Sequence, residues 1–430
     1  MMELTDIFTL LGGLALFLYG MTMMSNGLEL AAGNKMKTIL ERLTANRFIG
    51  VAVGALITAI IQSSSATTVM VVGFVNAGLM ELKSAVWIIM GANIGTTITG
   101  QLIAIDITAL APIIAFIGVA LIAFFKSKKL DAFGTIIAGL GILFMGMDIM
   151  SGAMEPLRDS PTFVSMVSSF ENPLIGILVG AGFTALIQSS SASVGILQAL
   201  ARSGVVTLPS AIYVLYGQNI GTCITSVLAS IGTTRNAKRT TIIHLSFNII
   251  GTIIFVIISM LTPFADFMAS LTPTNIPAQI ANVHTIFNVV TTIVLLPFGA
   301  QLVKLTYIVL PEKEGLEDKM TVKYLDASVF TNDYYIGRSA IVNRQLFNET
   351  QNMLSEVQQN VQRAFELMSN YDEAKHEEIL KHEEYIDYLN KEIIQYTTTA
   401  ISSEFPIEES QSIGLFLKTA GDLERVGDHA

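Results

Sequence analysis

The sequence predicts an all-α, polytopic membrane protein with two inverted repeats and a polar helical tail. Three observations predict this class. Of the 430 residues, 51% are hydrophobic and 14% are charged, so the chain carries more apolar surface than a water-soluble fold can bury. A long segment recurs at an offset of 126 residues. The charged residues are sparse before Lys304 and crowd the chain after Pro311, which predicts a second domain there.

The membrane-spanning segments follow from length. A bilayer core about 30 Å thick requires about 20 apolar residues per helix. The first candidate begins with Glu3 and Asp6 rather than a basic region, which favours a retained span over a cleaved signal peptide. Seven segments are long enough, near 5–28, 84–104, 109–125, 131–152, 208–231, 240–262 and 282–310.

Two further apolar stretches, 48–80 and 173–204, are each interrupted by a polar cluster. A lipid-exposed break would leave backbone groups without partners, so such breaks occur where they face protein or a water-filled cavity. Each stretch is therefore predicted to form two half-helices hinged at the cluster. The clusters are Gln62, Ser63, Ser64 and Ser65, and Gln188, Ser189, Ser190 and Ser191.

These two regions are copies of one another. Without a gap, 24 of 52 positions are identical between 48–99 and 174–225. A unit this long is typical of transporter duplications rather than of solenoids. The predicted repeats cover about 5–125 and 131–262, followed by an extra span at 282–310 within a membrane domain of residues 1–310.

Basic residues set the orientation. If each broken stretch enters and leaves by one face, eleven basic residues share one side and only Arg158 and Arg202 lie on the other. That side is predicted to be cytoplasmic, which gives the repeats opposite orientations and places the tail inside, at the inner (plasma) membrane. The eleven are Lys35, Lys37, Arg42, Arg47, Lys83, Lys126, Lys128, Lys129, Arg235, Lys238 and Arg239.

The serines suit an anion. After each glutamine, three serines can cap the second half-helix, which places hydroxyls beside free backbone N–H groups at its positive end. No lysine or arginine occurs in 48–80. The clusters therefore predict an anion cradle without a fixed positive charge, which also leaves room for a co-transported cation.

A second duplicated motif lies at 91–97 and 217–223, where two glycines within five residues are expected to loosen a helix. Freed carbonyls and neutral side-chain oxygens there are ligands of the kind sodium prefers. The side chains are Asn93, Thr96, Thr99, Asn219, Thr222 and Thr225.

Simpler explanations stay open for several residues. Close helix packing alone explains Gly50/Gly54 and Gly176/Gly180. His244 and His284 are interpreted as buried packing and hydrogen-bond anchors, with a proton relay as the alternative. Asp148 lies inside a candidate span, where acids are often functional, but also near its end.

At these residues the sequence resembles the sodium-dependent phosphate cotransporter family, whose hallmark is a Gln-Ser-Ser-Ser sequence in each of two inverted halves. The resemblance covers about residues 5–310. It implies that the serines of both clusters, with Asn93 and Asn219, contact phosphate. It also implies that Gln62, Gln188, Thr96, Thr99, Thr222 and Thr225 coordinate sodium. Cys223 replaces Thr97 in the second half, so the halves cannot offer identical ligands.

After a linker at 311–334, residues 335–430 resemble a PhoU domain, a helical bundle fused to bacterial members of this family. The bundle is expected to continue beyond Ala430. The apolar residues with helical spacing are Leu346, Met353, Val357, Val361, Phe365 and Met368.

The resemblance also implies a metal site in the tail. PhoU proteins bind metal through Glu-xxx-Asp pairs, which here are Glu383 with Asp387 and Glu424 with Asp428. Carboxylates four residues apart share one helix face. A solvated acidic surface is the alternative.

The sequence therefore predicts a sodium-coupled symporter of inorganic phosphate that works by alternating access. An exporter or a carrier of another oxyanion is the nearest alternative, and a membrane-anchored regulator of phosphate status is an alternative of another class. Nothing indicates an enzyme, a covalent cofactor or a nucleic-acid partner; membrane lipid surrounds the spans, and a homo-oligomer is left open. The single cysteine excludes an intramolecular disulfide.

Overall fold

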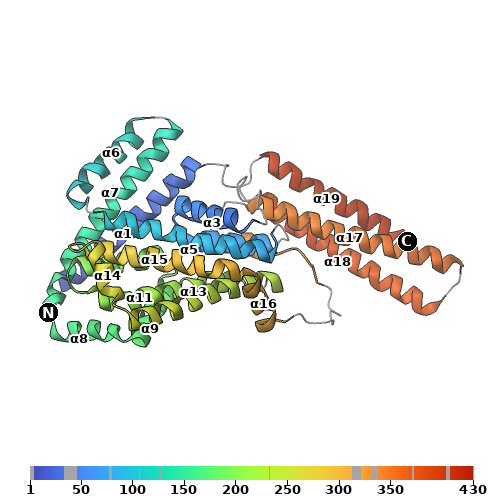
Figure 1. The fold of residues 1–430 in the computed structure, drawn as a ribbon. Coiled ribbons are helices and arrows are strands. Elements are labelled where there is room, and N and C mark those ends of the chain that lie inside the picture. Colours follow the sequence, from blue (N-terminus) through green and yellow to red (C-terminus); the bar gives the residue numbers. More distant parts are fainter. Residues whose placement is uncertain are drawn as a thin grey trace. The chain divides into compact units, whose positions relative to one another are not determined.

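The fold is given by a computed structural model, which describes residues 4–32, 46–76, 80–105, 107–125, 127–231, 233–311, 321–330, 338–369, 372–402 and 407–429. Every regular element in these ranges is a helix (Figure 1). The chain divides into two compact units. The first comprises Met1–Val72, Leu82–Ile231 and Lys238–Leu310, and the second comprises Gly73–Glu81, Gly232–Ala237 and Pro311–Ala430.

The first unit contains the apolar helices. In chain order the elements are α1 (Leu4–Ala32), α3 (Arg47–Ile61), α4 (Ser64–Asn76), α5 (Leu82–Ala104), η1 (Thr108–Leu110), α6 (Ala111–Phe124), α7 (Lys128–Met154), η2 (Glu155–Asp159), α8 (Pro161–Ser168), η3 (Ser169–Glu171), α9 (Pro173–Ile187), α10 (Ser190–Arg202), α11 (Leu208–Gly221), α12 (Cys223–Ala229), α13 (Arg235–Leu261), α14 (Phe264–Leu271), α15 (Ile276–Leu295), η4 (Leu296–Phe298) and α16 (Gly299–Val309). The last residues of α4 and the first of α13 belong to the second unit.

Five helical segments among the described residues are long and apolar enough to cross a membrane: Leu4–Leu28, Leu82–Ala104, Lys129–Asp159, Arg235–Leu261 and Ile276–Val309. They match five of the seven predicted spans, so the chain is a membrane protein. The other two predicted segments are also helical, but neither is among these five. The segment at 109–125 is a shorter apolar helix, Thr108–Phe124, and 208–231 divides into α11 and α12 at Thr222. The basic residues Lys35, Lys37, Arg42 and Lys126 lie outside the described ranges.

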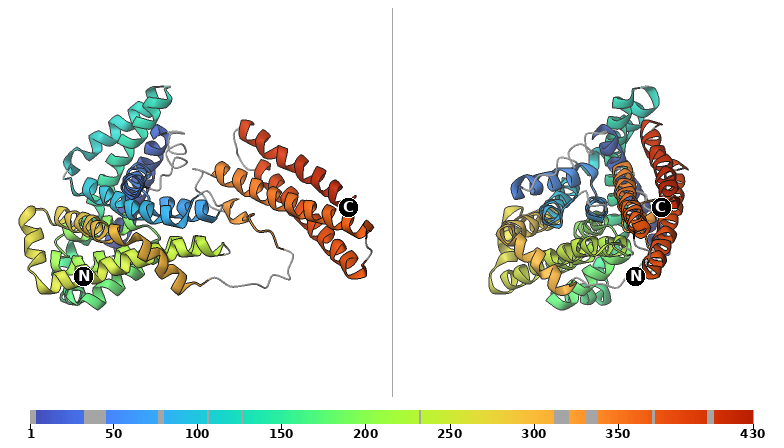
Figure 2. Two further views of the ribbon diagram at one scale, coloured as in Figure 1. Left: turned by 45° about the vertical axis from the view of Figure 1, so that its right-hand side comes forward. Right: turned by 90° about the vertical axis from the view of Figure 1, so that its right-hand side faces the viewer.

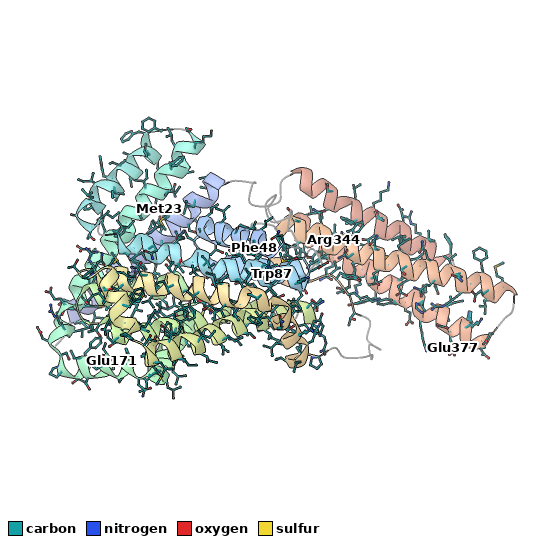
Figure 3. All side chains as sticks on the ribbon, viewed as in Figure 1. Met23, Phe48, Trp87, Glu171, Arg344 and Glu377 are labelled. Carbon is teal, nitrogen blue, oxygen red and sulfur yellow. The ribbon has the colours of Figure 1, made fainter. Side chains whose placement is uncertain are left out.

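Glycines let the backbones of neighbouring helices touch. A Cβ on Gly54 of α3 would lie 2.2 Å from the carbonyl oxygen of Ile88 in α5. In the second half, a Cβ on Gly180 of α9 would lie 1.9 Å from the carbonyl oxygen of Val214 in α11. Trp87, labelled in Figure 3, closes the α3–α5 contact, since its Cβ lies 2.6 Å from a Cβ built on Gly50. The packing explanation therefore holds for these glycines.

The expected loosening of the two glycine-containing spans occurs in only one of them. Helix α5 runs without a break from Leu82 to Ala104. In the second half, α11 ends at Gly221 and α12 begins at Cys223. The glycines of this motif pack against backbone carbonyls of the preceding half-helix in both halves, so this packing does not explain the difference.

The second unit is a helical bundle built from α17 (Arg338–Ser369), α18 (Glu373–Ser402) and α19 (Ile407–Asp428), preceded by η5 (Ala327–Phe330) (Figures 1 and 2). Leu346, Met353 and Val357 lie in its core, as the helical spacing predicts. Two residues expected on the same face are exposed, Phe365 by 67% and Met368 by 82%. Twelve residues of α-helix turn Phe365 about 120° away from Met353, so Phe365 lies off the buried stripe.

Candidate functional site

Both broken stretches fold back at their glutamines. Gln62 and Gln188 each have a φ of 58° and end the preceding helix in the left-handed conformation, which is unusual for a residue other than glycine. Thr58 Oγ1 donates to Thr67 Oγ1 at 2.9 Å. Nine residues of straight helix would span about 13 Å, so this contact requires a tight hairpin. Thr184 and Ser193 repeat the contact, also at 2.9 Å. The predicted half-helices are therefore present.

A serine caps the second half-helix of each hairpin. Ser63 Oγ accepts a hydrogen bond from the Ala66 amide at 3.1 Å, and Ser189 Oγ accepts one from the Ala192 amide at 3.3 Å. These caps leave other first-turn N–H groups of α4 and α10 without helical partners. The positive ends of both helix dipoles therefore lie at the serine clusters.

The two clusters meet in the folded chain. Ser64 Oγ lies 3.2 Å from Ser190 Oγ. Each cluster also reaches the opposite hinge, since Ser65 Oγ donates to the Gln188 carbonyl and Ser191 Oγ to the Gln62 carbonyl, both at 3.5 Å. Ser64 and Ser190 are both buried. Two helix N-termini and their hydroxyls thus converge on one buried, neutral place, which suits an anion.

Thr99 of α5 joins this place from the first half. Its Oγ1 donates to Gln62 Oε1 at 2.8 Å and lies 3.3 Å from Ser191 Oγ. Gln62 Nε2 donates to the Ala59 carbonyl, which fixes the amide with its oxygen toward Thr99. Two of the predicted sodium ligands therefore lie directly against the serines.

The equivalent residues of the second half are placed differently. The Gln188 side chain is exposed, whereas that of Gln62 is 5% exposed. Thr225 Oγ1 donates to the carbonyl of Thr222 in its own helix. In the first half, Thr96 Oγ1 likewise donates to the carbonyl of Ala92 in its own helix. The buried Thr222 Oγ1 has no hydrogen-bond partner among the described residues.

The two asparagines lie away from the serine hydroxyls. Asn93 Nδ2 donates to the Ile89 carbonyl, and Asn219 Nδ2 donates to the Leu215 carbonyl. Asn219 Oδ1 lies 3.1 Å from His284 Nε2, a partner that Asn93 does not share. Both asparagines are buried.

Other residues singled out from the sequence lie outside the serine site. Asp148 is exposed on α7. His284 is buried, as expected for an anchor. Sequence reasoning missed Ser25 of α1, whose Oγ donates to the Ile61 carbonyl at 2.5 Å, next to the Gln62 hinge. Its signal was the match of Ser25 with Ser151 at the repeat offset, although Ser151 donates to Ala199 instead.

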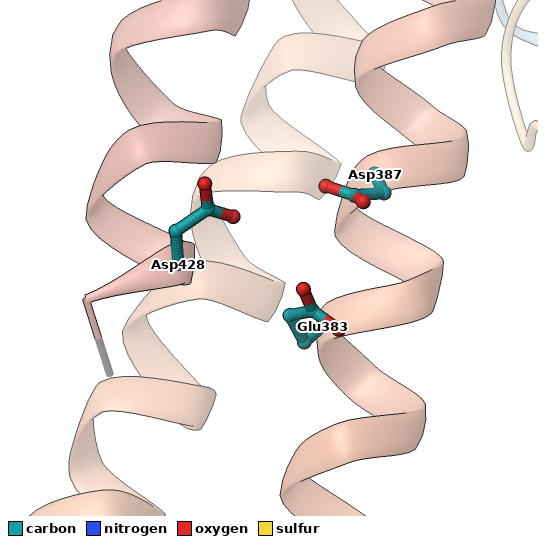
Figure 4. A group of neighbouring side chains, drawn as sticks. All are labelled: Glu383, Asp387 and Asp428. Carbon is teal, nitrogen blue, oxygen red and sulfur yellow. The ribbon is translucent and has the colours of Figure 1, made fainter.

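The tail carries three of its four predicted metal ligands as one group. Carboxylate oxygens of Glu383, Asp387 and Asp428 lie within 4.8 Å of one another (Figure 4). Burial and then the negative charge of Asp387 raise the pKa of Glu383. Glu424 is outside this group, but it lines one groove together with Asp387. Three carboxylates this close fit a hard divalent cation that prefers oxygen ligands.

Comparison with known families identifies the chain. The family model for the Na+/Pi-cotransporter matches residues 16–152 and 160–276, a range that includes both serine clusters. This protein belongs to the Na+/Pi-cotransporter family. That family consists of phosphate transporters and not of enzymes. A PhoU domain model matches residues 350–430, which include α18 and α19.

Relatives of this Na+/Pi-cotransporter family member include an uncharacterized protein, YqeW, of Bacillus subtilis (strain 168), which is 34% identical over 303 residues, 69% of this chain and 96% of YqeW. A putative inorganic phosphate export protein, YjbB, of Escherichia coli (strain K12) is 26% identical over 323 residues, 74% of this chain and 58% of YjbB. The sodium-dependent phosphate transport protein 2A of Rattus norvegicus is 37% identical over 105 residues, 24% of this chain and 16% of the relative. No solved structure matches the chain.

Proposed function

We propose that the protein is a sodium-coupled symporter of inorganic phosphate that works by alternating access. The observation that carries this proposal is the contact between Ser64 and Ser190, which joins the capped N-termini of α4 and α10. Phosphate would bind between these two half-helices, held by the serines of both clusters. Backbone N–H groups and hydroxyls can hold an anion without a permanent cation, so release stays easy.

The contact is compatible with movement of the two serine clusters during transport. Ser64 Oγ and Ser190 Oγ are 3.2 Å apart, within hydrogen-bond distance of each other. A single phosphate oxygen bonded to both hydroxyls needs them about 4.5 Å apart, because each bond is about 2.7 Å long. If one oxygen accepts from both hydroxyls, the serines separate when phosphate enters. Such separation fits two inverted repeats that rock against one another around a site at the membrane midplane.

Sodium would bind beside the phosphate. Gln62 Oε1 and Thr99 Oγ1 supply neutral oxygens in contact with Ser191, so a sodium ion there would lie close to the anion that it accompanies. Neutral oxygens suit sodium and discriminate against divalent ions, which usually demand carboxylates. A relative named for sodium-dependent phosphate transport supports this coupling. We include Gln188, Thr96, Thr222 and Thr225 as further sodium ligands, and Asn93 and Asn219 as further phosphate ligands, in other conformations of the cycle.

Phosphate export is a second candidate. It is favoured by the likeness to the putative inorganic phosphate export protein YjbB, which extends over 74% of this chain. The same site serves either direction, because the sodium gradient and the coupling decide which way phosphate moves.

The tail is proposed to lie in the cytoplasm at the inner membrane, with a divalent metal held by Glu383, Asp387 and Asp428. The bound metal would supply positive charge that offsets the repulsion among the three carboxylates. A regulatory role for this PhoU domain is compatible with transport by the membrane unit, because the proposed phosphate site lies wholly within residues 5–310.

Proteoliposomes containing the full chain test the proposal directly. Labelled phosphate should accumulate when sodium is outside and should fail to accumulate when potassium or choline replaces it. Accumulation that is equal in all three cations would remove sodium coupling. Efflux from loaded vesicles, driven by an opposite sodium gradient, would distinguish export from uptake.

A further inference from the structure

Helices α13 and α15 carry the same buried side chains at an offset of 40 residues. His244, Asn248 and Thr252 lie on α13, and His284, Asn288 and Thr292 lie on α15. Thr252 Oγ1 donates to the Tyr216 carbonyl, and Thr292 Oγ1 donates to the Met90 carbonyl. Met90 and Tyr216 are themselves 126 residues apart. Helix α13 therefore packs on α11 as α15 packs on α5.

This correspondence fails at one position. In the second half, Ser226 Oγ lies 3.1 Å from His244 Nδ1 and donates to Thr68 Oγ1 at 3.1 Å. The residues at the equivalent positions of the first half are Gly100, His284 and Val194, so the hydroxyls of both Ser226 and Thr68 have no counterpart there.

There is room beside Gly100 for the missing hydroxyl. A Cβ built on Gly100 meets Val194 Cγ1 at 3.5 Å and His284 Nδ1 at 4.0 Å, which are ordinary contacts. Gly95 on the same helix is different, since its Cβ would lie 2.4 Å from the Ala55 carbonyl oxygen. Gly100 is therefore not required for close packing of helices.

The hydrogen bonds of Asn219 determine which nitrogen of the neutral His284 ring carries the hydrogen. Asn219 Nδ2 donates to the Leu215 carbonyl, so its Oδ1 is the atom 3.1 Å from His284 Nε2. Because Oδ1 can only accept, Nε2 carries the hydrogen, and Nδ1 of the neutral ring is an acceptor. His284 is 2% exposed, and within the described part of the chain no donor reaches Nδ1.

A second buried acceptor lies near the same glycine. Gln198 Nε2 donates to the carbonyls of Gly100 and Pro277, at 3.0 and 2.9 Å, which fixes the orientation of the amide. Its Oε1 has no donor among the described residues, and the side chain is fully buried. A buried acceptor without a donor is costly, so a donor is expected for each of the two.

We propose that the space beside Gly100 is a binding site for one small neutral hydrogen-bond donor, a water molecule, that donates to His284 Nδ1 and Gln198 Oε1. Buried waters typically bond two to four polar groups in this way. Sodium fits less well, because an imidazole nitrogen is not among the hard oxygen ligands it prefers. The water fixes the orientation of the His284 ring through Nδ1, and the ring fixes the Asn219 side chain through Nε2. His284 is thus a positioning residue. This last step rests on the proposed phosphate site, to which Asn219 belongs.

Gly100→Ser and Gly100→Ala form a matched pair that differs by one hydroxyl. The serine adds a hydroxyl that can donate to His284 Nδ1, whereas the alanine methyl occupies the space without donating. We expect Gly100→Ser to keep the thermal stability and phosphate affinity of the parent. We expect Gly100→Ala to lower Tm measurably and to weaken phosphate binding by about 5-fold or more.

The measurements are a thermal unfolding curve and a calorimetric phosphate titration of the full chain in detergent. Equal behaviour of the two variants in both measurements would overturn the proposal. Absence of phosphate binding by the parent would refute the proposed function, while the comparison of Tm values would still test the water site. A parent whose Tm rises with sodium, next to a Gly100→Ser variant whose Tm does not, would show that the ligand is the cation and would also overturn the proposal.

Discussion

Ser64 Oγ lies 3.2 Å from Ser190 Oγ, although the two serines are 126 residues apart in the chain. Each serine begins a half-helix, so the contact joins the positive ends of α4 and α10. The hydrogen bonds around it recur at the same offset, as in the pairs Thr58–Thr67 and Thr184–Ser193. The two serine clusters repeat the same arrangement and meet at one place, so they offer the same donors from two directions, which suits a tetrahedral anion.

Thr99→Val tests the sodium ligands. The substitution removes the hydroxyl that donates to Gln62 Oε1 while it keeps the shape of the side chain. We expect sodium affinity to fall by about 2-fold to 10-fold, the net value of one buried hydrogen bond. Thr135→Val is the matched control, because Thr135 Oγ1 donates to the Asp131 carbonyl within α7, outside the proposed site, and should leave the affinity nearly unchanged. Equal losses in the two variants, measured by sodium activation of phosphate uptake, would contradict this placement of the ion.

Gly54→Ala and Gly180→Ala test the close contacts that hold the hairpins. The added Cβ would lie 2.2 Å from the Ile88 carbonyl oxygen in the first case and 1.9 Å from the Val214 carbonyl oxygen in the second. Overpacking of this kind costs about 1–3 kcal/mol, so both variants should unfold at a lower temperature. Gly182→Ala is the control, since nothing lies within 4 Å of a Cβ there. A Tm for Gly54→Ala as high as that of the control would show that the helices can separate freely.

The proposed topology can be tested with single cysteines in a Cys223→Ser background. Ser127 precedes α7 and should face the cytoplasm, whereas Asp159 follows the same span and should face outside. A membrane-impermeant maleimide added to intact cells should label the cysteine of Asp159→Cys only. Labelling of Ser127→Cys from outside would reverse the proposed orientation.

Divalent metal binding by the tail should depend on pH. Burial and neighbouring carboxylates raise the pKa of Glu383, so the folded tail binds protons there more readily than the unfolded chain does. Without metal, the contribution of Glu383 to stability therefore decreases as the pH rises above 4.5, the usual pKa of a glutamate carboxyl. Metal reverses this trend, because it displaces the protons. Stabilisation of the full chain by Mn²⁺ should thus be larger at pH 7 than at pH 5.

Glu383→Gln should abolish most of that stabilisation, with Glu384→Gln as the control, since Glu384 is exposed and outside the group of three. The measurement is Tm with and without Mn²⁺. If Glu383→Gln responds to the metal as the parent does, the three carboxylates are a solvated surface.

The sequence predicts much of this site because the hinge is a local feature repeated twice. A glutamine followed by three serines ends one helix and caps the next, so both hairpins could be expected from Gln62 and Gln188 alone. What could not be expected is which of two equivalent residues takes part. Thr99 Oγ1 donates to Gln62 Oε1, whereas Thr225 Oγ1 donates to the nearby carbonyl of Thr222. This difference depends on how the two halves are arranged relative to each other, which cannot be predicted from a local sequence pattern.

The same limit applies to the tail and the spans. Apolar residues at four-residue steps predict a buried stripe that runs from Met353 to Phe365, but only Met353 is buried. Each such step drifts by about 40° around the helix, so Phe365 lies about 120° away from Met353. Likewise, two glycines predict a weak helix in each half, but α5 is continuous through Gly91 while the equivalent helix divides at Thr222. The glycine contacts are alike in the two halves and do not account for this difference.

The double-mutant cycle of Ser64→Ala and Ser190→Ala tests the shared phosphate site most directly. Calorimetric titration of phosphate in saturating sodium, with Tm measured in parallel, gives four affinities. Each single substitution removes one donor to a buried anion and should cost about 1–3 kcal/mol, or about 5-fold to 150-fold in affinity. Because both serines contact one ligand, the cost of the double substitution should differ from the sum of the two. Unchanged affinity in both single variants, with folding intact, would contradict the shared site and leave the serines as helix caps.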